Sequence, residues 1–427
     1  MMVENVIIFE DDLTESFFPL IYTRSVFELK VGLFSSLERA YLLFPGAKFN
    51  LFSREYLKPI LSLRYPKYFT NNTNIGLRAL IINGRAILHR EQVDLLSIEE
   101  GKNQVVTSEG NLVFAYLTGE LLLDFVKLAR QVGFNGPELI QFLRKKTDVR
   151  IQHCQTSFIE SPWGMIASNG ERLTQDFQLL GKGGIFLSKI SPQVAMTCEE
   201  QIYIGKEVRI DPFVHIDASA GPVYIGDNVT IKSNVVIEGP ACIDDHCLIL
   251  PGYIRKNTSL GEGCRVGGEI SESIFLAHSN KQHAGFVGNS YVGEWVNFGA
   301  LTTTSNLKNN YGEVRLTKGY ENVQTGQHFL GSIIADHVKL GIGTLLTTGT
   351  IIGIGSSVAL SNRFLPKWIP SFAWMTGHGL SSYDLEKFLS MVMATYKRRN
   401  KVFGLPERSL MEYVYQLAKS ETKNPIS

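Results

Sequence analysis

The sequence predicts an α/β domain, followed by a left-handed parallel β-helix and a short C-terminal helical segment. Three observations predict this order. Aliphatic residues recur at every sixth position between Ile202 and Leu360. Apolar runs of strand length alternate with helical patterns over residues 1–180. Beyond Pro370 the apolar spacing becomes that of a helix.

The six-residue repeat fits neither the helical period nor the two-residue alternation of a strand. It is typical of a hexapeptide β-helix, in which very short parallel strands wind around a prism. Each repeat then points one aliphatic side chain inward, and the stacked coils share one apolar core. Glycines often follow the aliphatic position, as at Gly205 and Gly226, and we expect glycine and Asn or Asp at the corners to supply the backbone angles of tight bends. The residues in phase are Ile225, Ile231, Ile237, Ile243 and Ile249, then Ile254, Leu260 and Val266, then Ile334, Leu340, Leu346, Ile352 and Val358.

Strands and helices alternate in the first part of the chain. The expected strands are residues 3–9, 79–84 and 112–117, and the expected helices are residues 33–44, 120–132 and 137–145. This alternation predicts an α/β domain. The predicted divisions are the α/β domain at 1–180, a linker at 181–201, the β-helix at 202–362 and a C-terminal helical cap at 363–427. Such a cap would cover the apolar end of the last coil.

Composition limits the classes of function. The 427 residues are enough for two or three domains, and 44% hydrophobic with 19% charged residues is typical of a globular chain. A formal net charge of +1 argues against a general polyanion binder, so we expect no nucleic-acid partner. The N-terminus carries an acidic run in place of a signal peptide, and no apolar run is of membrane-spanning length. The five cysteines include no C-x-x-C pair, so we expect neither disulfides nor structural zinc, and a cytoplasmic protein without a membrane partner.

Polar residues cluster where the six-residue phase fails, between Val266 and Val292, and in the interruption at residues 305–330. The densest run is Ala277–Gly285, in which His283 stands close to amides and a lysine. Histidine titrates near neutrality, so it can accept a proton from an amine or hydroxyl that attacks an acyl group. Lysine and asparagine can hold a sugar or a phosphate, and loops that leave a regular solenoid often carry binding. The pattern predicts a catalytic histidine at an edge of the prism.

These residues resemble the hexapeptide acyltransferases, and in particular the GlmU-like family of bifunctional enzymes that make UDP-N-acetylglucosamine. The resemblance covers about residues 200–362. It is carried by a histidine five residues before a corner glycine, as His283 precedes Gly288, by the run Val296–Ala300, and by Asn306 beside a basic loop. The run S-N-K-Q-H-A-G-F-V-G resembles even more closely a divergent branch described as sugar-nucleotidyltransferase-like.

The resemblance implies that His283 is the general base, which deprotonates the amine of glucosamine 1-phosphate for attack on acetyl-CoA. It also implies a homotrimer, since related prism acyltransferases build their sites between neighbouring subunits. The binding residues that it implies are Asn297 and Asn306 for the sugar, and Lys281, Ala300 and Lys308 for phosphate or coenzyme A. Phe286 and Leu307 replace family tyrosines, and the family's G-A-G-T run appears as G-A-L-T, which leaves the shape of the acceptor sugar open.

The first domain is similar to sugar-1-phosphate nucleotidyltransferases. The run Pro19–Lys30 resembles the segment that holds nucleotide phosphates, which implies Arg24 and Lys30 in nucleotide binding; a surface salt bridge is the alternative for both. Asp11–Ser16 stands where such enzymes have a glycine-rich loop, and Arg85 follows a strand where they place a magnesium-binding aspartate. Arginine cannot ligate magnesium. Mg²⁺ and a nucleoside triphosphate are therefore expected only if this domain is active.

Two alternatives stay open. His246, His278 and His283 have a spacing similar to that of the trimeric prism carbonic anhydrases, in which three imidazoles around zinc activate water for a hydro-lyase reaction. The other alternative is a non-catalytic trimeric scaffold. We expect the acyltransferase and no resident metal, because a zinc site would also need supporting carboxylates.

Overall fold

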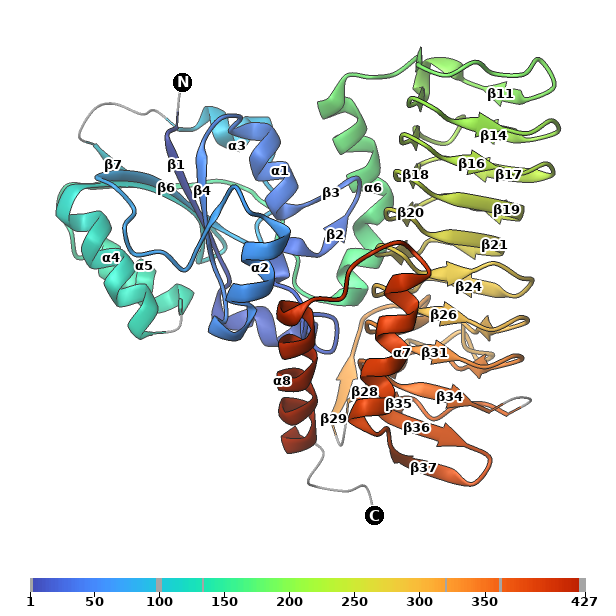
Figure 1. Cartoon of the computed structure of the whole chain (residues 1–427). Helices are drawn as coiled ribbons and strands as arrows, with labels where there is room; N and C mark the ends of the chain where they lie inside the picture. Colours follow the sequence, from blue (N-terminus) through green and yellow to red (C-terminus); the bar gives the residue numbers. More distant parts are fainter. Residues whose placement is uncertain (1–2, 97–101, 133, 319–320, 361–362, 422–427) are drawn as a thin grey trace. The chain divides into compact units, whose positions relative to one another are not determined.

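The computed structural model describes residues 3–96, 102–132, 134–318, 321–360 and 363–421 (Figure 1). The chain divides into two compact units. The first lies within Met1–Leu29, Phe34–Ser161 and Leu405–Leu410, and the second within Lys30–Leu33, Pro162–Gly404 and Met411–Ser427. The first unit contains the α/β domain and the second contains the β-helix.

The first unit is built on a seven-stranded sheet in the order β5-β4-β1-β6-β8-β7-β9. The first four of these strands are parallel, and β8 runs antiparallel to both β6 and β7. β1 and β6 are almost fully buried apolar runs, as parallel strands inside an α/β domain generally are. The strands are β1 (Asn5–Phe9), β4 (Lys48–Phe52), β5 (Phe69–Thr70), β6 (Arg78–Asn83), β7 (Asn103–Ser108), β8 (Asn111–Thr118) and β9 (Val149–His153), with the short strands β2 (Lys30–Val31) and β3 (Phe34–Ser35) elsewhere.

Helices pack their apolar stripes against this sheet. Leu122 and Phe125 of α4 share one buried cluster with Leu139 and Leu143 of α5 and with Ile81 of β6. The helices are α1 (Ser36–Leu43), α2 (Lys58–Arg64), α3 (Arg90–Asp94), α4 (Gly119–Gln131) and α5 (Gly136–Arg144). The three strands and three helices expected from the sequence are confirmed, with ends that differ by a few residues.

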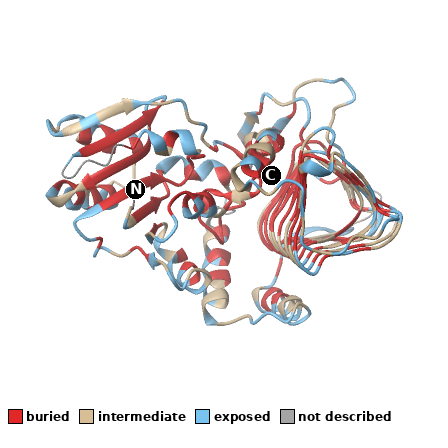
Figure 2. Ribbon diagram, turned by 90° about the horizontal axis from the view of Figure 1, so that it is seen from above, coloured by how far each residue is buried: buried red, intermediate tan, exposed pale blue. Residues whose placement is uncertain are grey.

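The second unit winds into a parallel β-helix, whose cross-section is triangular in the view along its coils (Figure 2). It contains a ten-stranded and a fourteen-stranded sheet. β19 pairs with both β16 and β17, and β21 with both β23 and β24. These two long strands therefore run around a corner, and the fourteen-stranded sheet forms two faces of the prism.

The strands of the β-helix are short. The ten-stranded sheet contains β10 (Ile185–Phe186), β12 (Ile202–Ile204), β15 (Val223–Ile225), β18 (Ala241–Ile243), β20 (Thr258–Leu260), β22 (Ile274–Phe275), β25 (Tyr291–Val292), β30 (Ser332–Ile334), β33 (Thr350–Ile352) and β35 (Trp368–Ile369). The fourteen-stranded sheet contains β11 (Ala195–Thr197), β13 (Arg209–Ile210), β14 (His215–Asp217), β16 (Thr230–Ile231), β17 (Val235–Glu238), β19 (Leu248–Ile254), β21 (Arg265–Ser271), β23 (Asn280–Lys281), β24 (Phe286–Gly288), β26 (Asn297–Phe298), β31 (Lys339–Leu340), β34 (Ser357–Ala359), β36 (Ala373–Thr376) and β37 (Gly379–Ser382). The others are the pair β27 (Thr303–Thr304) and β32 (Leu345–Leu346), and the hairpin β28 (Arg315–Lys318) and β29 (Glu321–Gln324). The later helices are α6 (Pro162–Leu180), α7 (Leu385–Lys397) and α8 (Leu405–Glu421).

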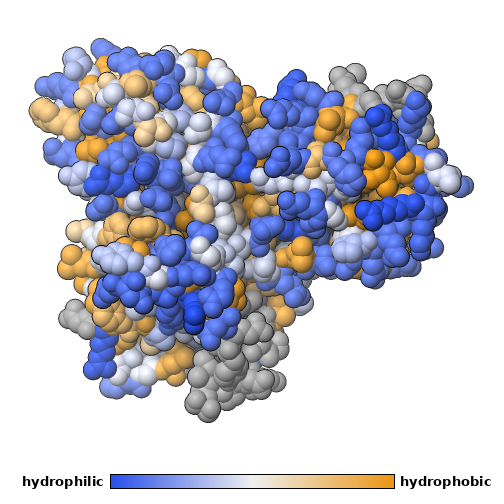
Figure 3. Space-filling model, turned by 180° about the vertical axis from the view of Figure 1, so that it is seen from behind, coloured by the Kyte–Doolittle hydropathy of each residue, from blue (hydrophilic) through white to orange (hydrophobic). Residues whose placement is uncertain are grey.

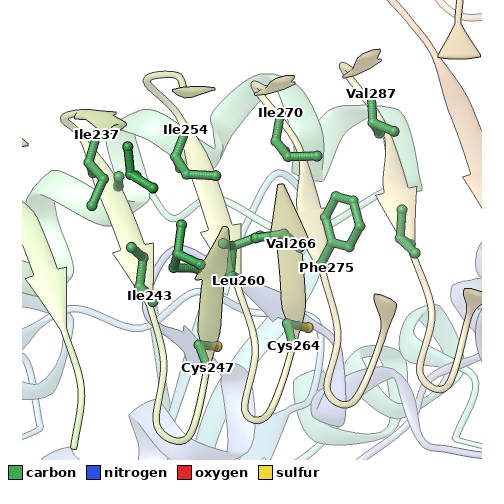
Figure 4. Close-up of a cluster of buried hydrophobic side chains, with 14 of the residues drawn as sticks. Ile237, Ile243, Cys247, Ile254, Leu260, Cys264, Val266, Ile270, Phe275 and Val287 are labelled. Carbon is green, nitrogen blue, oxygen red and sulfur yellow. The ribbon is translucent and has the colours of Figure 1, made fainter. Parts of the chain in front are cut away.

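Aliphatic side chains fill the interior of the prism in rows that run from coil to coil. Figure 4 shows one row, in which Ile237, Ile254, Ile270 and Val287 point inward from four successive coils. The strand register places each of them opposite the next, and all are at most 1% exposed. The β-helix and the inward aliphatic of its repeat are thus confirmed.

The β-helix begins earlier than predicted. β10 pairs with β12 and β11 pairs with β14, so residues 181–201, predicted as a linker, already contribute strands to it. Ile190 and Met196 pack against its core and continue the six-residue spacing back from Ile202, although a linker was predicted there. Helix α6 was not predicted, and its residues, which fall within the domain predicted at 1–180, belong to the second unit. At the other end β35 and β36 continue the sheets past residues 361–362, where the predicted boundary falls outside the described residues.

Helix α7 packs along one corner of the stacked coils. The rings of Trp295 and Tyr396 stack with centroids 4.3 Å apart, and Arg399, just beyond the helix, donates to the carbonyl oxygen of Gly263 over 2.9 Å. The helix therefore covers a corner over several coils, including the last coil, where its Phe388 packs against Phe372 with ring centroids 5.0 Å apart. The reason is that this corner presents an aromatic ring at Trp295, on which Tyr396 can stack.

Among the described residues, no helix has both the length and the apolar character needed to cross a bilayer. The face of the molecule in Figure 3 mixes hydrophilic with hydrophobic residues.

The glycines that follow the aliphatic position allow close stacking, rather than the unusual backbone angles that were expected. A Cβ on Gly226 would lie 2.8 Å from the amide nitrogen of Asp245 in the next coil, and one on Gly205 would lie 2.7 Å from the carbonyl carbon of Gly226. Positive φ angles occur instead at neighbouring corner residues, at His246 and also at Asn228, where the expectation for a corner asparagine is confirmed. The expectation of bend glycines was therefore wrong at Gly205 and Gly226.

Replacing Gly226 by alanine should destabilise the β-helix by about 1–3 kcal/mol, because the backbone of the next coil would have to move. Urea unfolding followed by circular dichroism measures this. Gly377→Ala is the control, since a Cβ there meets nothing within 4 Å, and its effect should stay within about 0.5 kcal/mol. Equal unfolding midpoints for Gly226→Ala and the wild type would contradict the close-stacking account.

Candidate functional site

His283 lies at the edge of the prism where β23 ends and β24 begins, and its side chain is exposed. The next coil closes tightly against this corner. The N–H of Leu301 donates to the carbonyl oxygen of Ala284 over 2.9 Å. Gly285 has a φ of 126°, and a Cβ there would lie 2.2 Å from the carbonyl oxygen of Thr302. Glycine at this position is what lets the two coils stack beside the histidine.

The coil before His283 turns the same edge with fewer residues. In most coils the interior residues on either side of this edge are six positions apart, but Val266 and Ile270 are only four apart. β21 therefore runs through the corner as one continuous strand. Gly268 permits this, because its φ is 72° and a Cβ there would lie 2.9 Å from the carbonyl oxygen of His283. The break in the six-residue phase is this shortened corner.

Lys281, implied in binding phosphate or coenzyme A, is buried inside the prism. It is 1% exposed and pairs with Val266 of the preceding coil. Its amine donates to the carbonyl oxygens of Gly267, over 3.2 Å, and of His283. Burial lowers the pKa of Lys281 to about 8. The implied role is wrong, because Lys281 stands six residues before Val287 and thus in an interior position.

Asn297 and Ala300 belong to the coil that follows His283, and both are half-buried. β26 sets Asn297 opposite Asn280 of β23. Ala300 lies in the corner after β26, where its carbonyl oxygen accepts from the N–H of Gly343 over 2.8 Å. Stacking therefore brings Ala300 to the edge that carries His283, whereas Asn297 lies over Asn280, whose Oδ1 accepts from Nη2 of Arg399 over 2.7 Å.

Asn306 lies beyond the other end of β24. Its Nδ2 donates to Oδ1 of Asn289 over 2.7 Å, and Nδ2 of Asn289 donates to Oε2 of Glu272 over 3.2 Å. This relay fixes the amide of Asn306. Neither Asn289 nor Glu272 was expected in the site. The signal that could have found them is their spacing of 17 residues, about one coil.

An aromatic ring lies beside Asn306. A Cβ on Gly288 would be 2.4 Å from Cζ of Phe286 and 2.9 Å from Nδ2 of Asn306. The ring and the amide thus meet over Gly288, so the corner glycine that carried the resemblance makes room for both. Together with His283 they line β24 from end to end.

Lys308 is tied into its own loop, where its amine donates to the carbonyl oxygen of Glu313. A bridge between Leu307 and Phe329 closes the loop at its base. Burial and the charge of Lys308 lower the pKa of Lys367, whose amine donates to the carbonyl oxygen of Arg315 over 3.1 Å. Two lysines are thus held at one loop, and both charges could face an anion.

The two cations implied in nucleotide binding are engaged within the protein. Arg24 is 2% exposed, and its Nη2 lies 3.4 Å from Oγ1 of Thr23. Lys30 forms an ion pair with Asp244 of the β-helix. The implied nucleotide role is wrong for Lys30, for which the salt-bridge alternative holds, and Arg24 is buried instead of lining a surface.

Helix α6 holds the segment Lys30–Leu33. The N–H of Gly32 donates to Oδ1 of Asn169 over 2.8 Å. The N–H of Leu33 donates to Oδ2 of Asp176 over 3.0 Å. Ser259 of β20 donates to the carbonyl oxygen of Gly32 over 3.0 Å. Asn169 and Asp176, which have no legible chemistry in the sequence, therefore serve to fasten this segment.

A buried ion pair occupies the ends of β1 and β6 in the first unit. Nε and Nη2 of Arg85 donate to Oδ1 and Oδ2 of Asp11 over 2.7 and 2.6 Å. The two side chains are 2% and 3% exposed. Asn83 donates to the same carboxylate over 2.9 Å, and Nη1 of Arg85 donates to the carbonyl oxygen of Ile159 over 3.1 Å. Both oxygens of Asp11 are thus engaged.

Comparison with known proteins agrees with this two-part architecture. Residues 6–184 match the sequence model of the sugar nucleotidyl transferase family. A bifunctional sugar-1-phosphate nucleotidylyltransferase/acetyltransferase of Sulfurisphaera tokodaii is 36% identical over 144 residues, which are 30% of this chain and 36% of that protein. The bifunctional protein GlmU of Heliobacterium modesticaldum is 32% identical over 162 residues, 37% of this chain and 34% of that protein. The chain is similar to bifunctional GlmU proteins over part of its length.

The GlmU-like chain spans about a third of the length of these curated relatives. Among solved structures, a CTP:phosphocholine cytidylyltransferase of Streptococcus pneumoniae covers 38% of this chain and 95% of its own, at a TM-score of 0.28 and 11% identity. That similarity is too low to bear on the fold.

The magnesium ion that the nucleotidyltransferase resemblance implies does not fit the end of β1 in this GlmU-like chain. Carboxylates and water are the ligands that Mg²⁺ prefers. Asp11 offers a carboxylate whose two oxygens are bonded to Arg85, and the guanidinium charge would repel a cation. The neighbouring carboxylate, Glu10, is paired with Arg54 over 3.0 Å. No step proposed below involves magnesium at this place.

The three histidines of the zinc alternative do not converge. The backbone N–H of His246 donates to the carbonyl oxygen of Asp227, and that of His278 to the carbonyl oxygen of Glu262. Both histidines lie in the column of corners along which α7 packs. His278 packs against Trp295 with ring centroids 4.4 Å apart, and burial lowers its pKa. His283 stands at a different edge. Within the described ranges, no three His, Cys, Asp or Glu side chains are grouped so as to hold a metal ion.

Arg85→Met should destabilise the first unit by about 3–5 kcal/mol, because it leaves the carboxylate of Asp11 buried and unpaired. Urea unfolding tests this, with Arg78→Met as the matched control. Arg78 pairs with Glu4 at 2.7 Å, but the side chains are 47% and 59% exposed, so the loss should be about 1 kcal/mol or less. Similar losses in the two variants would count against a buried ion pair.

Proposed function

We propose that the β-helix of this chain transfers the acetyl group of acetyl-CoA to the amine of an amino-sugar phosphate of the glucosamine 1-phosphate type, within sugar-nucleotide synthesis. The observation that carries the proposal is the exposed imidazole of His283 at a prism edge, with Asn297 and Ala300 in the next coil and Asn306 beyond β24. The relative from Sulfurisphaera tokodaii supports it, since its name gives nucleotidylyl and acetyl transfer. The reaction follows from general base chemistry.

In this reaction the amine nitrogen of the acceptor attacks the acetyl carbonyl carbon, and His283 takes a proton from that amine as the bond forms. The tetrahedral intermediate then expels the thiolate of coenzyme A, which receives the proton back from the imidazolium. A new C–N bond replaces the C–S bond, and no oxidant or metal is needed. Backbone N–H groups at the prism corners are the candidate donors to the intermediate's oxygen.

We assign the acceptor sugar to Asn297 and Asn306, and the coenzyme to Ala300 and Lys308. The relay through Asn289 and Glu272 supports the choice of Asn306, because an amide held in one orientation can discriminate hydroxyl positions. We further propose a homotrimer in the cytoplasm. All five cysteines are free thiols, which agrees with a reducing compartment.

His283→Ala should lower acetyl transfer by about a hundredfold or more, since a general base contributes about 10²–10⁴-fold. The assay follows release of free coenzyme A thiol with glucosamine 1-phosphate as acceptor. His246→Asn is the control, because it changes an exposed histidine at another corner to the residue type found one coil earlier at Asn228, with nearly the same φ of 58° against 59°. The control should keep wild-type turnover.

The rivals give different results in the same experiments. Equal turnover in wild type and His283→Ala, including none, would favour a non-catalytic scaffold. Zinc bound at one ion per chain in purified protein would favour the hydro-lyase.

Nucleotidyl transfer by the first unit is the second candidate function, and the family match over residues 6–184 favours it. We expect slow or no release of pyrophosphate from UTP or dTTP with magnesium and a sugar 1-phosphate, because Arg85 and Asp11 neutralise each other. A coupled pyrophosphate assay measures this, with a GlmU enzyme as the positive control. Brisk release would show that this ion pair does not prevent the reaction.

A further inference from the structure

One interior row of the β-helix contains a lysine among aliphatic and aromatic residues. The row runs through successive coils as Ile231, Ile249, Val266, Lys281, Phe298 and Leu340. Lys281 is 1% exposed. A buried amine loses its hydration, whereas an aliphatic side chain at this place would not, so the amine must gain compensating contacts. Those contacts show what the lysine does.

The amine of Lys281 bridges two corners of the same edge. It donates to the carbonyl oxygen of Gly267 in the shortened corner and to that of His283 in the next coil. A Cβ on Gly268 would lie 3.0 Å from this amine and 2.9 Å from the carbonyl oxygens of both His283 and Gly285. The amine of Lys281, the carbonyl groups that it binds at Gly267 and His283, and the backbone of Gly268 thus pack tightly together at the corner that carries His283.

This contact is additional to the ordinary one, which the coil of His283 also makes, since the carbonyl oxygen of Ala284 accepts from the N–H of Leu301 over 2.9 Å. In a regular coil, a carbonyl at this edge accepts from an N–H of the next coil, as Phe213 does from Asn234 over 3.3 Å. The preceding corner is two residues shorter than the regular one, so the coils are out of step beside His283. The long side chain of Lys281 reaches across this step from inside and binds the carbonyl of the histidine itself.

We propose that Lys281 is a positioning residue for His283: its amine fixes the histidine's carbonyl group, and with it the backbone from which the imidazole projects. The proposal rests on the proposed acetyl transfer by His283. Proton transfer depends on distance, and a misplacement of about 1 Å can cost about a hundredfold in rate. Losing one of the hydrogen bonds that hold the corner should have a smaller effect, of about tenfold.

Lys281→Met tests this, because methionine has a similar length and no hydrogen-bond donor. We expect kcat for acetyl transfer to fall about tenfold, while KM for acetyl-CoA and for glucosamine 1-phosphate stays within about twofold. Deuterium uptake should rise in the peptide that covers residues 279–288. Leu340→Met, in the same interior row two coils further on, is the control and should change neither kcat nor uptake at this corner.

Unchanged kcat in Lys281→Met, or a KM that rises as far as kcat falls, would overturn the positioning role. If wild type and His283→Ala turn over equally, the proposed function fails, and deuterium uptake then decides the anchoring of the corner by itself: equal uptake in wild type and Lys281→Met refutes it. If Lys281→Met does not fold, the wild-type peptide decides. Exchange as slow as in the interior strands supports the anchor, and exchange as fast as in an exposed loop overturns it.

Discussion

Backbone hydrogen bonds between successive coils, with one inward side chain per repeat, constrain everything else in the β-helix. Each coil touches only its neighbours, so a change in one corner must be absorbed within one or two coils. The interior accepts apolar side chains without cost but requires a partner for any polar atom. Chemistry is therefore confined to corners and outer faces, and an interior polar residue marks a place where the backbone itself needs support.

The charged residues illustrate why a resemblance to a ligand-binding motif does not establish a ligand site. Lys30 belongs to a run that resembles a nucleotide-binding segment, and Arg85 stands where that family places a magnesium-binding aspartate. Each of them pairs with a carboxylate of this chain. The partners, Asp244 and Asp11, are 214 and 74 residues away in the sequence. Burial decides which pairs matter energetically, because an unpaired buried charge costs several kcal/mol whereas an exposed pair contributes about 1 kcal/mol or less.

The fold was predictable from the sequence because its main signal is periodic. The repeat gave the β-helix and its interior rows, and local alternation gave the strands and helices of the first domain. The start of the β-helix was missed although Ile190, Met196 and Ile202 keep the six-residue spacing. The role of α6 depends on contacts with distant residues, such as that of Asn169 with the N–H of Gly32, 137 residues away. No local pattern contains such information.

The candidate catalytic residue was predictable from the sequence, but the contacts that hold its backbone were not. His283 follows from the cluster of polar residues, and its edge position follows from the phase. The inward direction of Lys281 was also readable, since counting six back from Val287 places it inside; the motif resemblance overrode that count. The shortened corner could not be predicted, because the four-residue spacing from Val266 to Ile270 is recognised as a corner only when the coils are stacked.

The same spacing explains why the polar cluster and the break in the repeat coincide. A regular corner satisfies its own backbone groups, so it needs no polar side chain from inside. The corner before His283 is shorter by two residues, and at this edge the carbonyl oxygens of Gly267 and His283 both accept from a side chain, the amine of Lys281. An aliphatic residue at 281 would leave the carbonyl oxygen of His283 without the lysine's hydrogen bond, at a cost of about 1–3 kcal/mol where it is buried. The irregularity and the lysine therefore depend on each other, and both lie directly behind the imidazole.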